Sequence, residues 1–126
     1  MQNVDTKYQA LFTPWKIRDV EIKNRIVLSP MGGTSLFGWM EHTGNHFDKE
    51  AAKFFLEKAN NNVGLLITGI APIRSTFMGQ WLWQNKKMFA ELKEFMEEIH
   101  KTGAKLFIQI TAGMGRSWAI PTPLVM

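Results

Sequence analysis

The sequence predicts an α/β fold built on a parallel β-sheet. Three apolar runs of strand length, within residues 25–31, 63–73 and 105–110, alternate with two segments that have the apolar spacing of helices. Continuous hydrophobicity, as opposed to alternation, suits strands that are covered on both faces, as in parallel sheets. The order strand, helix, strand, helix, strand is typical of this class.

The other predicted elements follow in chain order. Short β-like runs predict a hairpin made of residues 15–17 and 20–22. A first helix is expected over residues 45–59, where aromatic residues and alanines recur with helical spacing, and Asn45 or Asp48 is expected to cap its start. A second, more amphipathic helix is expected over residues 88–99, and Gly103 follows where a C-terminal glycine is expected.

Composition narrows the class of protein. The 126 residues suit one domain, and no apolar run approaches the length of a membrane span. The net charge is +4, but the 15 Lys and Arg residues are scattered, which argues against a nucleic-acid surface. The absence of cysteine excludes disulfides and thiolate ligands within these residues. We therefore expect a cytoplasmic protein that binds a small molecule and neither nucleic acid nor a membrane.

The unusual residues fall where the predicted strands end. "PMGGT", "TGIAP" and "QITAGMG" each follow an apolar run, and the carboxyl ends of parallel strands share one edge, where ligands bind. Glycine lets a ligand approach the main chain without meeting a Cβ atom, and proline stiffens the approach. No phosphate-loop motif occurs. The pattern therefore favours a flat ring lying against Pro30, Met31 and Gly32.

Gln109 is the most informative single residue. It interrupts the apolar run "LFIQI", where an amide must find hydrogen-bond partners or destabilise the fold. Its acceptor and two donors complement an imide-like edge, such as the pyrimidine side of a flavin. The alternative is a buried glutamine that bonds to a neighbouring strand, and both interpretations stay open on the sequence alone.

Three motifs in order resemble one known family. "LFTPWKIRDVEIKNRIVLSPMG", "VGLLITGIAP" and "GAKLFIQITAGMGR" resemble the N-terminal part of the old yellow enzymes, particularly the 2-enoate reductase and 2,4-dienoyl-CoA reductase branch. The resemblance implies a (β/α)8 TIM barrel preceded by a short β-hairpin, with FMN at the carboxyl ends of the strands. It places Pro30, Met31 and Gly32 beside the flavin ring. It also places Gly69 at the second strand end and Gln109 on the pyrimidine edge.

The same resemblance implies an activity, and it also implies that residues 1–126 are only part of a domain. The family passes hydride from NAD(P)H through FMN to an activated C=C bond, such as an enoate or enoyl thioester. A full barrel takes roughly 250 residues, so residues 1–126 are expected to be a partial FMN-binding domain, truncated after about the third strand. The family's catalytic residues, phosphate loops, and any FAD or 4Fe-4S sites lie beyond residue 126. We expect the chain alone to be inactive, and the alternative is a non-catalytic fragment that is stable only by oligomerising or pairing with a partner.

Other candidates are weaker. His42 and His46 are four residues apart, but no third ligand follows at a recognisable spacing, so no metal site is expected. Arg116 is interpreted as a solvated cation and the tryptophans at 81 and 83 as packing residues. Arg25, at the entry of a strand, is expected to be structural.

Overall fold

The computed structural model describes residues 6–31, 36, 47–72 and 86–111. Its elements, in chain order, are η1 (Thr6–Phe12), β1 (Trp15–Ile17), β2 (Val20–Ile22), β3 (Val27–Leu28), α1 (Lys49–Asn60), β4 (Leu65–Pro72), α2 (Lys86–Lys101) and β5 (Lys105–Thr111). β1 and β2 form the predicted antiparallel hairpin, and β3, β4 and β5 form a parallel sheet in that order. The predicted α/β class is therefore observed in the described residues.

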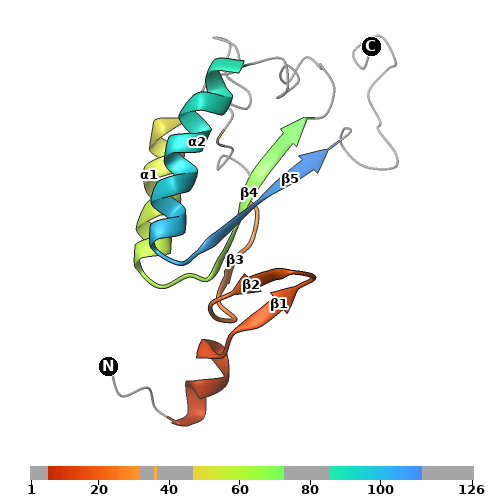
Figure 1. Cartoon of the computed structure of the whole chain (residues 1–126), viewed down its shortest axis with the longest axis vertical. Helices are drawn as coiled ribbons and strands as arrows, with labels where there is room; N and C mark the ends of the chain where they lie inside the picture. Colours follow the sequence, from red (N-terminus) through yellow and green to blue (C-terminus); the bar gives the residue numbers. More distant parts are fainter. Residues whose placement is uncertain (1–5, 32–35, 37–46, 73–85, 112–126) are drawn as a thin grey trace.

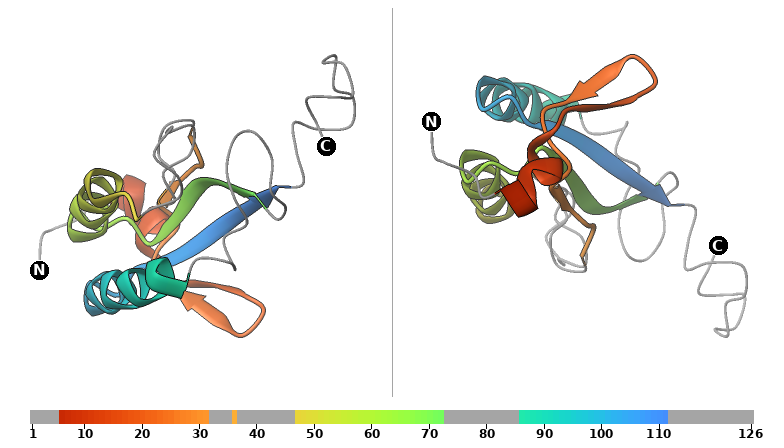
Figure 2. Two further views of the ribbon diagram at one scale, coloured as in Figure 1. Left: turned by 90° about the horizontal axis from the view of Figure 1, so that it is seen from above. Right: turned by 90° about the horizontal axis from the view of Figure 1, so that it is seen from below.

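The two helices cover one face of the parallel sheet (Figures 1 and 2). Their buried residues, led by Phe55, Met88, Phe95 and Ile99, pack with Leu66 of β4 in one apolar core. Burial of this apolar area is the main favourable term in folding. The helices therefore hold the sheet from one side only.

Local sequence sets the ends of α1. The Asp48 carboxylate accepts hydrogen bonds from the backbone N–H groups of Glu50 and Ala51, at 3.0 and 2.9 Å. Asp48, one of the two expected caps, is therefore the N-cap, and α1 begins at Lys49. After the helix, Asn62 adopts a left-handed conformation with φ of 68° and turns the chain into β4. Asparagine tolerates this conformation better than most residues.

β3 is shorter than the predicted run over residues 25–31. It pairs with β4 only through Val27 and Leu28. Pro30 follows closely and has no N–H group to donate to a neighbouring strand. Pro30 and Met31 therefore lie beyond the paired part of β3, at the end of the strand where a ligand site was predicted.

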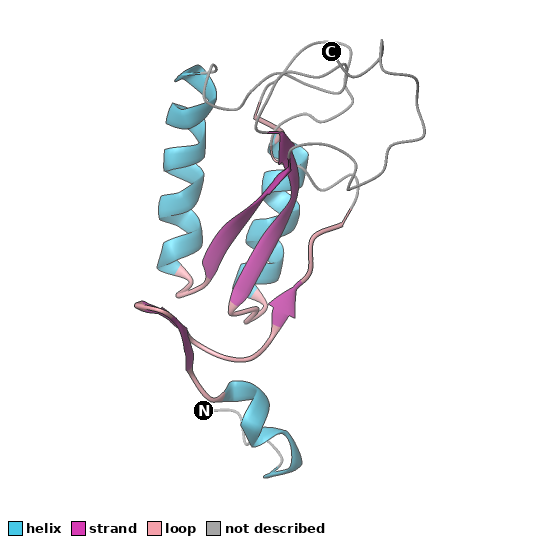
Figure 3. Cartoon of the chain, turned by 90° about the vertical axis from the view of Figure 1, so that its right-hand side faces the viewer, coloured by secondary structure: helices cyan, strands magenta, loops and turns pink. Residues whose placement is uncertain are grey.

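The hairpin lies at the amino ends of the strands (Figures 1 and 3). Asn24, which is 2% exposed, ties it to the sheet. Its side-chain amide donates to the Asn62 carbonyl at 2.7 Å, and its side-chain oxygen accepts from the Ile26 N–H at 3.1 Å. The indole N–H of Trp15 donates to the Asn24 carbonyl at 2.7 Å. A Cβ atom at Gly64 would overlap the Asn24 side-chain oxygen, which explains the glycine there.

Arg25 and Lys23 also make hydrogen bonds at this end of the sheet. Arg25, as expected, is structural: its Nε donates to the Thr13 hydroxyl at 3.0 Å, and its backbone N–H donates to the Leu11 carbonyl at 2.8 Å. The Lys23 ammonium donates to the Thr102 carbonyl at 2.8 Å, just past the end of α2. Desolvation by burial lowers the pKa of Lys23.

The buried Asn24 side chain should matter more to stability than an exposed asparagine. Replacing Asn24 with Ala leaves the partly buried Asn62 carbonyl and Ile26 N–H group without these partners, and we expect the free energy of unfolding to fall by about 2 kcal/mol. Asn61→Ala is the matched control, because that amide also donates to a carbonyl, Glu57, but at an exposed position. We expect the control to cost about 0.5 kcal/mol or less. Urea unfolding measures both, and equal losses would contradict the assignment.

Candidate functional site

The carboxyl ends of the parallel strands lie together at one edge of the sheet. The register pairs Leu28 of β3 with Leu66 of β4, and Ile70 of β4 with Gln109 of β5. Gly69 and Gln109 therefore lie toward the carboxyl ends of β4 and β5, and Met31 follows β3 at the same end of the sheet. The hairpin lies at the opposite end (Figure 1). This is the convergence predicted from the sequence. Gly32 lies outside the described residues, as do His42, His46, Arg116 and the tryptophans at 81 and 83.

A β-bulge lies in β4 beside this edge. Between Ile67 and Ile70 the register with β5 shifts, so that three steps along β4 match two steps along β5. Leu66 and Ala71 are five residues apart and would lie on opposite faces of a regular strand. The bulge lets both pack into the core under the helices. It also pairs Ile70 with Gln109, so it determines which residues of β4 lie beside Gln109 at the carboxyl end of the strands.

Thr68 stabilises the bulge. Its side chain is fully buried, and its hydroxyl donates to the Gly69 carbonyl at 2.8 Å. Gly69 is itself buried, and the bulge interrupts the hydrogen bonding between β4 and β5 at this point. The Thr68 hydroxyl therefore gives the Gly69 carbonyl a hydrogen-bond partner there. Thr68 and Ala71 were missed in the sequence analysis. A threonine before a glycine inside a strand-like run was the available signal, because glycine in a strand often marks a bulge.

Gln109 does not have the buried environment that the sequence suggested. Its side chain is exposed, and in the described part of the chain it has no hydrogen-bond partner on a neighbouring strand. The expectation that Gln109 is buried is therefore wrong. Within the described residues, the alternative that Gln109 bonds to a neighbouring strand is wrong as well. The reason is that, within the described residues, the helices cover only one face of the sheet (Figure 2), so an apolar run in β5 does not imply that both of its faces are covered.

Strand alternation fixes the direction of Gln109. Leu106 packs against the core under the helices, and successive side chains point to opposite faces. Phe107 and Gln109 therefore lie on the face away from α1 and α2, with Gln109 nearer the strand's carboxyl end. Met31, 45% exposed, lies at the same edge after β3. The site is thus the exposed Gln109 amide near the buried Gly69 in register, with Met31 at the same end of the sheet.

This arrangement can bind a planar polar group. An amide with no partner in the described structure can donate and accept side by side, which matches an imide edge. A buried glycine nearby presents backbone without a Cβ atom. The residues present therefore fit the pyrimidine side of a flavin. No group of three or more potential metal-ligating side chains occurs in the described ranges, and no described helix is long and apolar enough to cross a membrane.

The fold and the site together define the first part of a β/α barrel, in which parallel strands present a ligand edge at their carboxyl ends. A model of the NADH:flavin oxidoreductase / NADH oxidase family matches residues 10–119. The chain belongs to this family, as its motifs indicated.

Two known proteins are similar to the chain in sequence. The chain is 35% identical over 117 residues to a cinnamate reductase of Clostridium sporogenes, covering 87% of this chain and 17% of that protein. It is 34% identical over 108 residues to an NADPH dehydrogenase of Bacillus velezensis, covering 81% of this chain and 30% of that protein. The chain therefore spans less than a third of either relative.

Solved structures confirm the fold. An old yellow enzyme from Pichia sp. AKU4542 superposes with a TM-score of 0.62 at 26% identity, covering 80% of this chain and 26% of that chain. The old yellow enzyme from Trypanosoma cruzi gives a TM-score of 0.66 at 19% identity, covering 83% and 27%. The described residues are thus the N-terminal portion of a (β/α)8 barrel preceded by a β-hairpin.

The hydroxyl of Thr68 should contribute measurably to the bulge. Thr68→Val keeps the shape of the side chain but leaves the buried Gly69 carbonyl without this donor, and we expect a loss of about 1–2 kcal/mol of stability. Thr13→Val is the control, because the Thr13 hydroxyl makes two hydrogen bonds at an exposed position: it donates to the Ala10 carbonyl at 2.8 Å and accepts from Arg25 Nε at 3.0 Å. That change should cost only about 0.5 kcal/mol or less. Thermal unfolding compares the two, and a larger loss for Thr13→Val would refute the role of Thr68.

Proposed function

We propose that residues 1–126 form the N-terminal part of an FMN-binding domain in an ene-reductase. Such an enzyme passes hydride from NAD(P)H to the activated C=C bond of an enoate or enoyl thioester. The observation that carries the proposal is the shared strand edge, where the exposed Gln109 lies level with the end of β4. Family membership supports the flavin, and the similarity to a cinnamate reductase supports an enoate substrate.

The chain's own residues would bind and orient the flavin. Gln109 would donate to and accept from the pyrimidine edge, and this amide–imide pairing fixes the rotation of the ring in its plane. Gly69 would allow close approach of the ring to the end of β4. Pro30, Met31 and Gly32 would lie along the ring after β3. Bound there, FMN supplies the hydride chemistry, while the protein supplies its position and electrostatic surroundings.

Part of the proposed domain must come from outside residues 1–126. β5 has no partner on its outer edge in the described structure, and Ile110 near its end is 69% exposed. An unpaired edge with exposed isoleucines favours association with further strands. We propose that residues 1–126 alone hold FMN weakly and do not reduce C=C bonds. The second candidate, a non-catalytic fragment that pairs with a partner, rests on this same open edge.

The test is to purify the protein with its natural C-terminus and record its visible spectrum and NAD(P)H oxidation with cinnamate. We expect a yellow protein with flavin absorbance and enoate-dependent oxidation of NAD(P)H. A colourless protein that gains no flavin absorbance after incubation with FMN, and that shows no turnover, would refute the ene-reductase and favour the non-catalytic candidate.

In the same protein, Gln109→Leu tests the assigned site. Loss of the paired amide should weaken FMN binding by about 1–3 kcal/mol, or about 5- to 150-fold in dissociation constant. Ile110→Ala is the control, since Ile110 is the next residue on the opposite face of β5 and should leave flavin affinity within about twofold. Fluorescence titration measures both. Unchanged affinity in Gln109→Leu would remove Gln109 from the site without affecting the proposed reaction.

A further inference from the structure

A buried hydroxyl lies next to the proposed flavin edge. Thr68 of β4 is fully buried, and its hydroxyl donates to the carbonyl of the next residue, Gly69, at 2.8 Å. A buried hydroxyl needs a partner, but any nearby acceptor would satisfy that need. The bond to Gly69 is strictly local, so it ties together the two residues that form the bulge in β4.

The bulge weakens the hold of the sheet on Gly69. Thr68 and Gly69 together lie opposite the single residue Ile108 of β5. Two residues against one leave part of the main chain without its ladder hydrogen bonds. Glycine also has more conformational freedom than any other residue. The Thr68 hydroxyl therefore supplies a bond at a point that would otherwise be loosely held.

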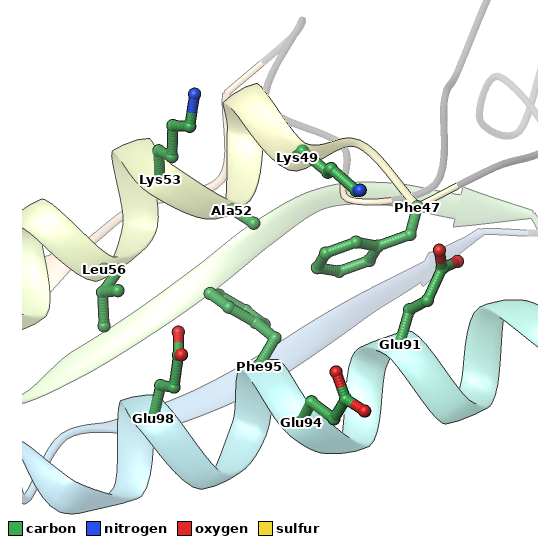
Figure 4. Close-up of a pocket in the computed structure, with 9 residues that line it drawn as sticks. All are labelled: Phe47, Lys49, Ala52, Lys53, Leu56, Glu91, Glu94, Phe95 and Glu98. Carbon is green, nitrogen blue, oxygen red and sulfur yellow. The ribbon is translucent and has the colours of Figure 1, made fainter.

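The core fixes the residue after the bulge through one methyl group. Ala71 belongs to the buried cluster that includes Phe95 of α2 and Ala52 of α1. Figure 4 shows Phe95 and Ala52 pointing into the space between the two helices. Burial of a single methyl group stabilises a protein about as much as one hydrogen bond does. The Thr68 hydroxyl is thus comparable to the core contact of Ala71 in holding the bulge.

The position of Gly69 relative to Gln109 decides how a flat ring fits. In an unbroken register Gly69 would pair with Gln109, whereas the bulge pairs Gln109 with Ile70 and leaves Gly69 one residue before that pair. A rigid ring that is bound at its pyrimidine edge by Gln109 can also lie against Gly69 only if the two residues keep one separation. Displacement of either residue therefore weakens the contact at the other.

We propose that Thr68 is a positioning residue for the flavin, acting through Gly69 without touching the ring. Its hydroxyl holds the Gly69 carbonyl, and this bond keeps the separation of Gly69 and Gln109 that the ring requires. The proposal rests on the proposed function, because it needs FMN at the shared strand edge. It goes beyond a role in stability, since it makes the FMN affinity of the folded protein depend on one buried hydroxyl.

Two substitutions of Thr68, in the protein with its natural C-terminus, separate the hydroxyl from the shape of the side chain. Thr68→Val keeps the shape and removes the hydroxyl, whereas Thr68→Ser keeps the hydroxyl and removes a methyl group. We expect Thr68→Val to raise the FMN dissociation constant about 5- to 20-fold and Thr68→Ser to raise it less than about threefold. Fluorescence titration measures both, at a temperature where circular dichroism shows every variant folded. If Thr68→Val does not fold, Thr68→Ala takes its place as the variant without a hydroxyl.

Thr102→Val controls for a general loss of stability. The Thr102 hydroxyl is partly buried and donates to the Ile99 carbonyl at 2.7 Å, before the start of β5 and therefore at the end of the sheet away from the flavin edge. Its removal should destabilise the protein but leave the FMN dissociation constant within about twofold.

A double-mutant cycle with Gln109→Leu tests the coupling. Once Gln109 no longer fixes the ring, the ring can follow a displaced Gly69, so Thr68→Val should change the dissociation constant less than about twofold in that background. An equal effect of Thr68→Val in both backgrounds overturns the proposal. So does an unchanged dissociation constant in Thr68→Val, even with a lower melting temperature. An effect of Thr68→Ser as large as that of Thr68→Val overturns it as well.

Failure of the proposed function gives a different result. If the unmodified protein binds no FMN, the proposed function and the role of Thr68 fall together. If Gln109→Leu leaves FMN binding unchanged, the role of Thr68 falls while the proposed reaction stands. Binding that Gln109→Leu weakens and Thr68→Val does not weaken keeps the flavin site and removes only the role of Thr68.

Discussion

The parallel pairing of β3, β4 and β5 is the constraint on which the rest of the structure depends. It puts the three strand ends at one edge and the three strand starts at the other. Each parallel connection needs a crossover, and both crossovers move in the same direction along the sheet. Because such crossovers share one handedness, both helices lie on one face. The residues of the proposed flavin site and the structural residues are thereby separated: Gly69 and Gln109 lie toward the carboxyl ends, and Asn24 and Lys23 stabilise the opposite end.

The bulge at Thr68 and Gly69 refines this arrangement. Without the extra residue, Ala71 could not share a core with Leu66, and Ile70 would not lie level with Gln109. A buried hydroxyl supplies the bond that compensates for the interrupted ladder. Bulges beside a ligand edge serve to re-aim side chains. As a result, the buried residues of β4 stay in the core, while the carboxyl end of β4 lies at the proposed flavin site.

The two faces of the sheet have different surroundings. The helix face is densely packed, whereas Gln109 is exposed on the other face, and the edge of β5 has no strand beside it in the described structure. In a complete barrel the second face is the interior, filled by side chains from all the strands. The chain spans 17% of the cinnamate reductase and 30% of the NADPH dehydrogenase that it resembles. The exposed face therefore fits one part of a larger closed sheet.

Much of the fold could be predicted from residue patterns, whereas the environments of single residues could not. The hairpin, both helices and the second and third parallel strands follow from local turn chemistry and apolar periodicity, and these are nearest-neighbour properties. The burial of Gln109 depends on strands that lie beside it in space, and an apolar run does not reveal whether they are present. The bulge was missed for a similar reason, since a register shift is a property of two strands together.

The most direct test of the central claim is hydrogen–deuterium exchange of the protein with its natural C-terminus, with and without FMN. If the shared strand edge binds the flavin, amides at residues 69–71 and 109–111 should exchange more slowly with FMN. Amides at the strand starts, residues 24–27, 62–65 and 103–105, should change little. Slower exchange confined to the strand starts, or no change at either end despite bound flavin, would contradict the account.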